Sequence, residues 1–405
     1  MRHALLALFL LASACSTPPT RSPELRAKDL ARRFVIVDGH VDLPSRLLGQ
    51  QKDGQPVDDV GQRTGGEFDL PRAFAGGLDA PFMSIYTGAE EAELGTSRQT
   101  AEAMIDLVEA IARAHPERCA IARSAADVRA LAANGKVALL LGMENGSPAE
   151  NDLADLDHFQ QRGVRYVTLC HGKDNKICDS SYDTRHTNGG LTAYGRDFVR
   201  RMNELGVLVD VSHIDDKSFW QVLELVRAPV IASHSSLRHF VPGFERNMDD
   251  DMVRAVGKNG GVVMINFGSS FLTQAANEHG LVERKAVDAF ATERGLAPDA
   301  PEVQAFRDQY MVEHPFPFAD VKDAADHVLR VVELAGVEHV GFGSDFDGVG
   351  DSLPTGLKDV SMYPNLIAEL LRRGLSEADV EQVCGGNLLR VLEANERLAA
   401  ELARN

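Results

Sequence analysis

The feature that most constrains the fold is a repeated alternation of short apolar runs with longer, charged segments of helical character. Eight runs are rich in Val, Ile, Leu and Met and lack the polar alternation of a half-exposed strand. Such runs are typical of strands buried on both faces, and their alternation with helices is typical of parallel β/α units. The runs cover residues 34–38, 81–86, 137–143, 164–169, 207–211, 230–233, 261–267 and 339–343.

Eight parallel strands predict an α/β fold of the (β/α)8, TIM-barrel type, although an open doubly wound sheet would show the same alternation. The longest interruption, 268–320, follows the seventh strand, and its stretch 273–307 is helical in character. We expect this helical insertion to overhang the barrel mouth as a lid or wall, or equally to be a plain packing insertion. Two closing helices are expected from residue 363 onward.

Composition places the chain among globular proteins and excludes some partners. Its 405 residues are 44% hydrophobic and 25% charged, and the formal net charge is −18. We expect no nucleic-acid binding, because a phosphate backbone requires a basic face. No CxxC pair is present, so a cysteine zinc site is not expected. Cys170 and Cys178 could pair in an oxidising compartment, which the sequence does not decide.

The amino-terminal segment is typical of an export signal. An apolar run over 4–14 follows Arg2, is too short to span a bilayer, and ends in small residues before Cys15. It resembles a bacterial lipoprotein signal with Cys15 as the lipidated residue. We therefore expect a signal peptide (1–14), a lipidated tether (15–25) and one barrel domain (26–405). The protein would be exported to the bacterial cell envelope, facing the periplasm, and would meet the membrane only through the lipid on Cys15.

Residues able to bind a metal follow six of the eight predicted strands. In a barrel the carboxyl ends of all strands meet at one face, so these residues are expected to converge. Each one alone has a plain structural interpretation, a salt bridge or a hydrogen-bonded core histidine. All of them together favour a metal site. They are His40 and Asp42, Glu144, His171, His213, His234 and Asp345.

The donor types suit zinc, with manganese, cobalt or iron as alternatives. More ligands are available than one ion requires, and a single glutamate can bridge two ions around a shared hydroxide. We assign His40 and Asp42 to one ion and His213 and His234 to the other, with Glu144 between them.

Seven motifs, in order along the chain, resemble the membrane (renal) dipeptidase family of the metal-dependent amidohydrolase superfamily. The resemblance spans roughly Val35 to Leu392. The motifs are Asp38-Gly39-His40-Val41-Asp42, Gly142-Met143-Glu144-Asn145, Val167-Thr168-Leu169-Cys170-His171, Asp210-Val211-Ser212-His213, Ser233-His234-Ser235-Ser236, Arg246-Asn247 and Gly341-Phe342-Gly343-Ser344-Asp345-Phe346-Asp347-Gly348.

The resemblance implies two Zn2+ ions on the ligands assigned above. It also implies that His171 stabilises the oxyanion of the substrate. Arg246 would bind the substrate's C-terminal carboxylate, with Arg238 as a competing residue. Asp345 would serve as base and then acid, with Asp347 as the alternative.

The implied function is a zinc-dependent dipeptidase that acts on dipeptides, including those with a C-terminal D-residue. Alternatives are another amidohydrolase-type reaction, namely N-acyl amino acid deacylation, lactone or β-lactam hydrolysis, or a non-catalytic lipoprotein that binds a metal or peptide. The disulfide cysteines of the mammalian members are not recognisable here, so a homodimer stays open. Tyr86, the loop 173–183 and the insertion are expected to shape substrate preference.

Overall fold

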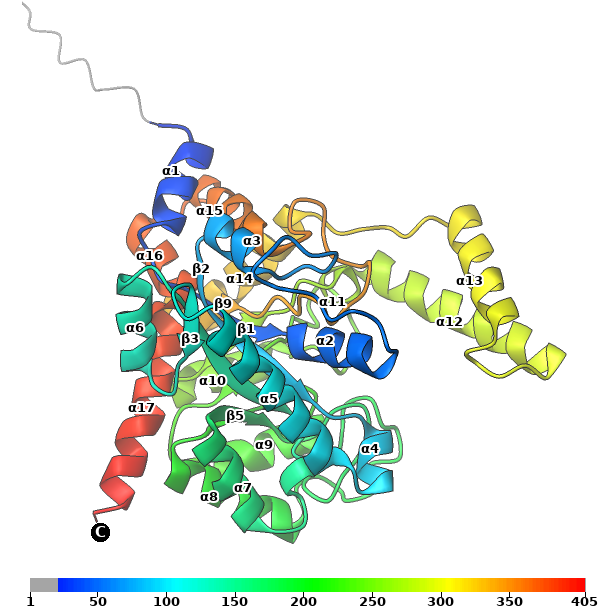
Figure 1. Ribbon diagram of the computed structural model, residues 1–405, viewed down its shortest axis with the longest axis horizontal. Coiled ribbons are helices and arrows are strands. Elements are labelled where there is room, and N and C mark those ends of the chain that lie inside the picture. The colour runs from blue at the N-terminus through cyan, green and yellow to red at the C-terminus, as the bar shows by residue number, and fades with distance from the viewer. Residues whose placement is uncertain (1–20, 405) are drawn as a thin grey trace, which may run out of the picture.

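Eight parallel strands close into a barrel in the computed structural model, which describes residues 21–404 (Figure 1). Neighbours follow the order β2-β1-β9-β8-β7-β6-β5-β4, and pairing of β2 with β4 closes the ring. The TIM-type barrel predicted from the apolar runs is confirmed. The barrel strands are β1 (Ile36–Val41), β2 (Leu78–Tyr86), β4 (Val137–Glu144), β5 (Val164–Thr168), β6 (Leu208–Asp210), β7 (Ile231–Ala232), β8 (Val262–Ile265) and β9 (Val340–Phe342).

A ninth strand, β3 (Cys119–Ile121), was not predicted. It pairs with the first three residues of β4 and takes no part in barrel closure. Its apolar run, 119–122, holds one β-branched residue, Ile121, and no aromatic residue, so the sequence does not distinguish this strand from a loop.

Helices surround the strands, and local capping residues fix where they begin and end. The Thr192 side chain accepts the Gly195 N–H at the start of α8, and left-handed Gly206 ends that helix. Asp249 and Gly260 do the same for α10. The helices around the barrel are α2 (Leu43–Lys52), α3 (Leu70–Gly76), α4 (Ala89–Leu94), α5 (Ser97–Ala114), α6 (Ala125–Ala133), η1 (Ser147–Ala149), α7 (Leu153–Arg162), α8 (Ala193–Leu205), α9 (Asp216–Leu225), α10 (Asp250–Asn259), α14 (Val321–Ala335), η2 (Val337–His339) and η3 (Val360–Met362).

The chain closes with helices that seal the amino-terminal end of the barrel. Leu388, Leu389 and Leu392 belong to one buried cluster with residues from the beginnings of the strands, such as Val37 and Ile231. The predicted closing helices are α15 (Tyr363–Arg372) and a nearly continuous run of α16 (Glu377–Glu381), the π-helical turn η4 (Gln382–Gly386) and α17 (Asn387–Leu402). The first described helix, α1 (Pro23–Ala31), packs against α15.

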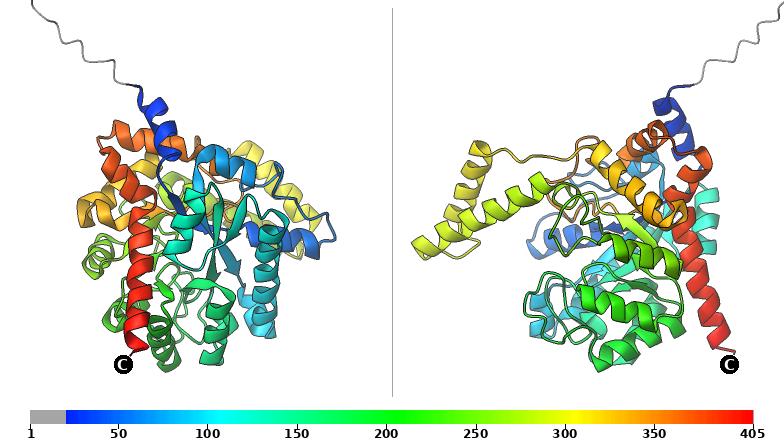
Figure 2. Two further views of the ribbon diagram at one scale, coloured as in Figure 1. Left: turned by 60° about the vertical axis from the view of Figure 1, so that its left-hand side comes forward. Right: turned by 180° about the vertical axis from the view of Figure 1, so that it is seen from behind.

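The insertion after β8 comprises α11 (Ser269–Leu272), α12 (Gln274–Arg294) and α13 (Pro301–Glu313). Helices α12 and α13 project away from the barrel as an arm (Figures 1 and 2). The arm has its own small core around Val287 and Val303, beside stacked Phe290 and Phe306 rings 4.3 Å apart. The arm points away from the barrel (Figure 1) and does not form the expected lid, whereas α11 stays against the barrel, where Phe271 packs on Phe244 and forms part of a wall.

The predicted signal peptide and Cys15 lie outside the described residues. Helix α1 begins at Pro23, inside the range expected for the tether, because Ser22 caps its first turn. Within residues 21–404, no helix is both long enough and apolar enough to cross a membrane. Cys170 and Cys178 are buried free thiols.

Candidate metal centre

Every barrel strand contributes to the site at the carboxyl end of the barrel. The candidate metal-binding residues that follow six of the strands converge as expected, and the other two strands supply hydrogen-bond donors to the acids. Ser84 of β2 donates to Glu144 Oε2 at 3.1 Å. Asn266, which follows β8, donates to Asp345 Oδ2 at 2.7 Å. Serine and asparagine occur throughout the chain, so their residue types do not mark Ser84 and Asn266 as site residues. Only their positions near the carboxyl ends of predicted strands could have indicated them.

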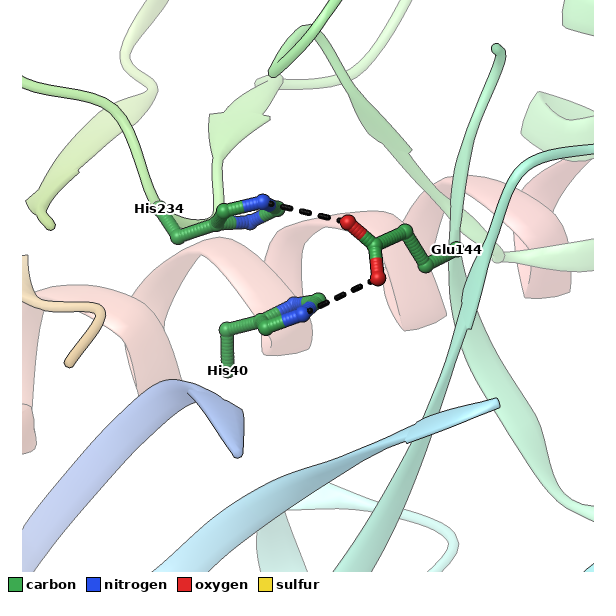
Figure 3. Close-up of side chains that lie close together, drawn as sticks. All are labelled: His40, Glu144 and His234. Atoms are coloured by element: carbon green, nitrogen blue, oxygen red, sulfur yellow. Dashed lines mark ion pairs between the residues drawn. The ribbon is translucent and has the colours of Figure 1, made fainter. Parts of the chain in front are cut away.

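Glu144 lies at the centre of the cluster, and its two oxygens face different histidines. Oε1 is 3.2 Å from His213 Nε2 and 3.3 Å from His234 Nε2. Oε2 is 3.3 Å from His40 Nε2, on the opposite side of the carboxylate (Figure 3). A carboxylate in this arrangement can bridge two ions, one at each oxygen.

The remaining contacts complete a donor set for each side of Glu144. His40 Nε2 lies 3.2 Å from Asp42 Oδ2, and the Nε2 atoms of His213 and His234 are 2.9 Å apart. All five side chains are buried, and His40 Nε2 has no hydrogen-bond partner within the described chain. Converging imidazole nitrogens and carboxylates at a buried point are costly unless a cation joins them, so these residues fit a pair of divalent ions.

The possible ligand sets are wider than the five residues assigned from the sequence. His171 lies within ligand range of Glu144 and His213, and Asp345 lies within ligand range of His40 and Asp42. Both side chains therefore belong to the same cluster as the five assigned residues.

The pKa values of Glu144, His213 and His234 are shifted by burial and by their charged neighbours. Burial alone would raise the pKa of Glu144, but His40, His171 and the other histidines hold it well below its ordinary value. Burial and the nearby Arg246 guanidinium lower the pKa values of His213 and His234 well below the ordinary range. An ionised glutamate and neutral imidazoles are the protonation states that metal binding requires. His40 is the exception: burial alone would lower its pKa, but Tyr166, Glu144 and Asp42 raise it well above the ordinary value, so a cation would have to displace its proton.

A buried aspartate orients His234 through a serine. Asp210 accepts the Ser212 and Ser233 N–H groups and the hydroxyls of Thr168 and Ser233. Since Ser233 gives its only hydroxyl proton to Asp210, its oxygen accepts from His234 Nδ1, 2.7 Å away. This assigns the ring proton to Nδ1 and leaves the Nε2 lone pair facing Glu144.

Tyr166 orients His40 from inside the barrel. Its hydroxyl lies 2.7 Å from His40 Nδ1, while its ring packs against Phe82, with the ring centroids 5.0 Å apart. Gly142 makes room for this ring, because a Cβ at that position would lie 2.0 Å from Tyr166 Cζ. Neither Tyr166 nor Asp210 was singled out from the sequence.

His171 and Tyr86 form one side of the site. The His171 ring is 4.2 Å from the His213 ring, and Nε2 is 3.5 Å from Glu144 Oε1. Tyr86 packs edge-on against His171 at 4.7 Å. Burial lowers the pKa of His171, although Glu144 opposes the shift, so the ring is suited to donating a hydrogen bond as a neutral imidazole.

Asp345 and Asp347 lie in different surroundings. Burial and the charge of Asp42 raise the pKa of Asp345 to about 8. Asp347 instead accepts the Glu67 N–H at 2.7 Å and pairs with Arg46 Nε at 3.1 Å. Asp345 therefore lies in the cluster, whereas Asp347 ties its loop to neighbouring segments.

The two candidate arginines also differ. Arg246 is buried and donates to Ser235 Oγ and to the His234 carbonyl, each at 2.7 Å, while its Nε has no partner among the described residues. Arg238 is held by Asp216 and by the carbonyls of Glu245 and Asn247. The structure thus places Arg246 beside the histidines with a free donor.

Comparison with known proteins agrees with this architecture. A family model described as membrane dipeptidase (peptidase family M19) matches residues 24–405. The dipeptidase tcpJ of Claviceps purpurea is 35% identical over 373 residues, which cover 90% of this chain and 77% of the relative. The dipeptidase ataJ of Aspergillus terreus is 31% identical over 95% of this chain and 90% of its own length.

A solved structure is similar over nearly the same range. The crystal structure of the probable dipeptidase PvdM from Pseudomonas aeruginosa matches with a TM-score of 0.79 and 29% identity, covering 93% of this chain and 99% of that one. Barrel, strand-end cluster and sequence agree, and the chain belongs to the membrane dipeptidase family of peptide-bond hydrolases.

Proposed function

We propose that this chain is a zinc-dependent dipeptidase that uses two Zn2+ ions. The observation that carries the proposal is the placement of Glu144, whose two carboxylate oxygens face His40 on one side and His213 with His234 on the other. His40 and Asp42 would hold one ion, and His213 and His234 the other. When bound, the ions supply Lewis acidity and an activated water molecule.

The side chains of the chain perform the remaining steps. Arg246 binds the free carboxylate of the dipeptide through its guanidinium N–H groups and so positions the scissile bond near the cluster. His171 donates a hydrogen bond to the carbonyl oxygen as negative charge develops there. Asp345, held by Asn266, accepts a proton from the attacking water and transfers it to the departing amine. Divalent cations beside Asp345 would favour its carboxylate form at neutral pH.

A panel of dipeptides with C-terminal L- and D-residues, assayed with zinc and after chelation, tests the proposal. We expect turnover that chelation abolishes and zinc restores. Parallel assays of N-acyl amino acids, a lactone and a β-lactam distinguish the other amidohydrolase reactions. Turnover that is indifferent to the chelator would contradict the metal-dependent mechanism, and absence of turnover on every substrate would favour a non-catalytic binding protein.

Substitution of the two neighbouring aspartates refines the assignment of the acid and base. Asp345→Asn should lose most of its turnover number, whereas Asp347→Asn, which alters only the loop contacts, should lose less. Full turnover by Asp345→Asn would remove that residue from the mechanism.

We also propose that residues 1–15 export the protein and attach it by a lipid on Cys15. The proposal is supported by the apolar run over 4–14 that ends at Cys15. In a bacterial host that carries out lipoprotein modification, we expect the full chain in the membrane fraction and Cys15→Ala in the soluble fraction. Equal partitioning of the two proteins would contradict the anchor.

A further inference from the structure

Three aromatic side chains from three different segments form a row at the mouth of the site. Tyr182 lies in the loop after β5, Phe244 in the loop after β7, and Phe271 in α11 after β8. The ring centroids are 6.1 Å apart between Tyr182 and Phe244 and 5.6 Å apart between Phe244 and Phe271. We call these three residues the aromatic wall.

The aromatic wall connects the metal cluster with Arg246. At one end the Tyr182 ring lies 5.9 Å from the ring of His213. At the other end the Arg246 guanidinium carbon lies 5.4 Å from the centroid of the Phe271 ring. If Arg246 binds the terminal carboxylate of a dipeptide, the Cα atom of the C-terminal residue therefore lies beside these rings.

The wall is incompletely covered by the protein itself. Tyr182 is 43% exposed, and its hydroxyl makes no hydrogen bond to any residue of the described range 21–404. Phe244 and Phe271 are half-buried. The aromatic rings of the barrel core, such as Phe267 and Phe342, are in contrast fully buried. Exposed rings beside a polar cluster provide apolar surface that a ligand can cover.

We propose that the aromatic wall is the subsite for the side chain of the C-terminal residue of the dipeptide. The enzyme then prefers dipeptides whose C-terminal residue is large and apolar or aromatic. The inference rests on the proposed function, because it requires Arg246 to bind the terminal carboxylate. Only the Cα atom separates that carboxylate from the side chain, so a substrate anchored at Arg246 brings its C-terminal side chain against Phe271 and Phe244. On the other side of the cluster, a single ring, Tyr86, packs against His171.

Two non-hydrolysable phosphinate dipeptide mimics that differ only in their C-terminal side chain, alanine or phenylalanine, test the subsite. Each is titrated calorimetrically into the zinc-loaded full chain. We expect the phenylalanine mimic to bind about tenfold or more tightly than the alanine mimic, as an additional buried ring should. Phe244→Ala and Tyr182→Ala should each reduce this ratio several-fold while changing the Kd of the alanine mimic little.

Two control variants test whether the preference depends on the rings of the aromatic wall rather than on the Tyr182 hydroxyl or on the loss of any exposed ring. Tyr182→Phe keeps the ring and should keep the preference. Phe74, on α3, has a ring of similar exposure, 41%, which packs against Arg118 away from the site. Phe74→Ala should therefore also keep the preference. Thermal melting confirms that each variant is folded.

Equal affinities for the two mimics, or a preference that survives both Phe244→Ala and Tyr182→Ala, would overturn the inference. Dipeptide turnover measured in parallel separates the two claims. Turnover without a C-terminal preference would leave the proposed function standing and overturn the subsite, whereas absence of both turnover and mimic binding would overturn both.

Discussion

The two ends of the barrel are built from the same strands but by opposite chemistry. At the amino-terminal end, the beginnings of the strands and α17 bury aliphatic side chains such as Val37, Ile231 and Leu392 against one another. At the carboxyl end, the same strands lead to carboxylates and imidazoles that are equally buried. The first end contributes stability through apolar burial, and the second concentrates polar groups that destabilise the fold unless cations join them. Stability and function can therefore be changed separately.

The largest expected effect is at the carboxyl end, from Glu144→Gln. The variant loses the charge that faces both histidine sets, so we expect kcat/KM to fall on the order of 10³-fold or more. Zinc binding measured by calorimetry should also be lost, while the metal-free protein stays as stable as the native chain or becomes more so, because a buried charge is removed. Glu150→Gln, at a buried carboxylate that accepts the Lys176 N–H outside the cluster, is the matched control. Retention of two bound ions by Glu144→Gln would contradict the bridging role.

Leu392→Ala tests the opposite end. It leaves a cavity among fully buried side chains, so the free energy of unfolding should fall by about 2–5 kcal/mol in a denaturant titration. The turnover number per folded molecule should not change, because no group of the site is altered. Leu94→Ala, at a residue that is 69% exposed, should leave the stability nearly unchanged. A large loss of turnover number in folded Leu392→Ala would show that the two ends are coupled.

Ser233→Ala has a smaller expected effect and tests the hydrogen bonds behind the metal cluster. It removes the link between Asp210 and His234, so zinc affinity measured by chelator competition should fall about 10–100-fold. Ser218→Ala deletes a buried hydroxyl without a partner in the described chain and should leave the affinity unchanged. If the two alanine variants bind zinc equally well, Ser233 does not position His234.

The smallest expected effect concerns pH at the amino-terminal end. Burial raises the pKa of Asp79 to about 6, although its carboxylate accepts the Ile36 N–H. An acid whose pKa is higher in the folded state than in the unfolded state lowers the free energy of unfolding as pH rises. The loss takes place between the unfolded pKa, near 4, and the folded pKa. Asp79→Asn should therefore be the more stable protein by about 1–2 kcal/mol above pH 6, and the difference should vanish below about pH 4. Denaturant titrations across this range would contradict the account if the difference grew towards low pH.

The sequence predicts the barrel and the cluster at its carboxyl end for a common reason. Continuous apolar runs mark strands buried on both faces, and an ionisable residue directly after such a run stands out against it, as His213 and His234 do. Strand β3 could not be predicted, because its short apolar run holds only one β-branched residue and no aromatic residue. The direction of the α12–α13 arm could not be predicted, because the helical periodicity of 273–307 predicts helices but not how they are oriented relative to the barrel.

Other parts of the site depend on strand register and could not be predicted from single residues. Ser84, Tyr166 and Asn266 are ordinary residue types within apolar runs, and only the closed barrel brings them to Glu144, His40 and Asp345. The aromatic wall joins three segments that are distant in the chain. Two of them, the loop 173–183 with Tyr182 and the insertion with Phe271, were expected to shape substrate preference, but that their rings meet Phe244 depends on the closed barrel.

Anomalous diffraction at the zinc edge, from crystals of the zinc-loaded protein, tests the central claim most directly. We expect two peaks at the carboxyl end of the barrel, about 3.5–4 Å apart, with the Glu144 carboxylate between them. One peak would lie beside His40 and Asp42 and the other beside His213 and His234. A single peak, or peaks outside coordinating distance of Glu144, would contradict that claim.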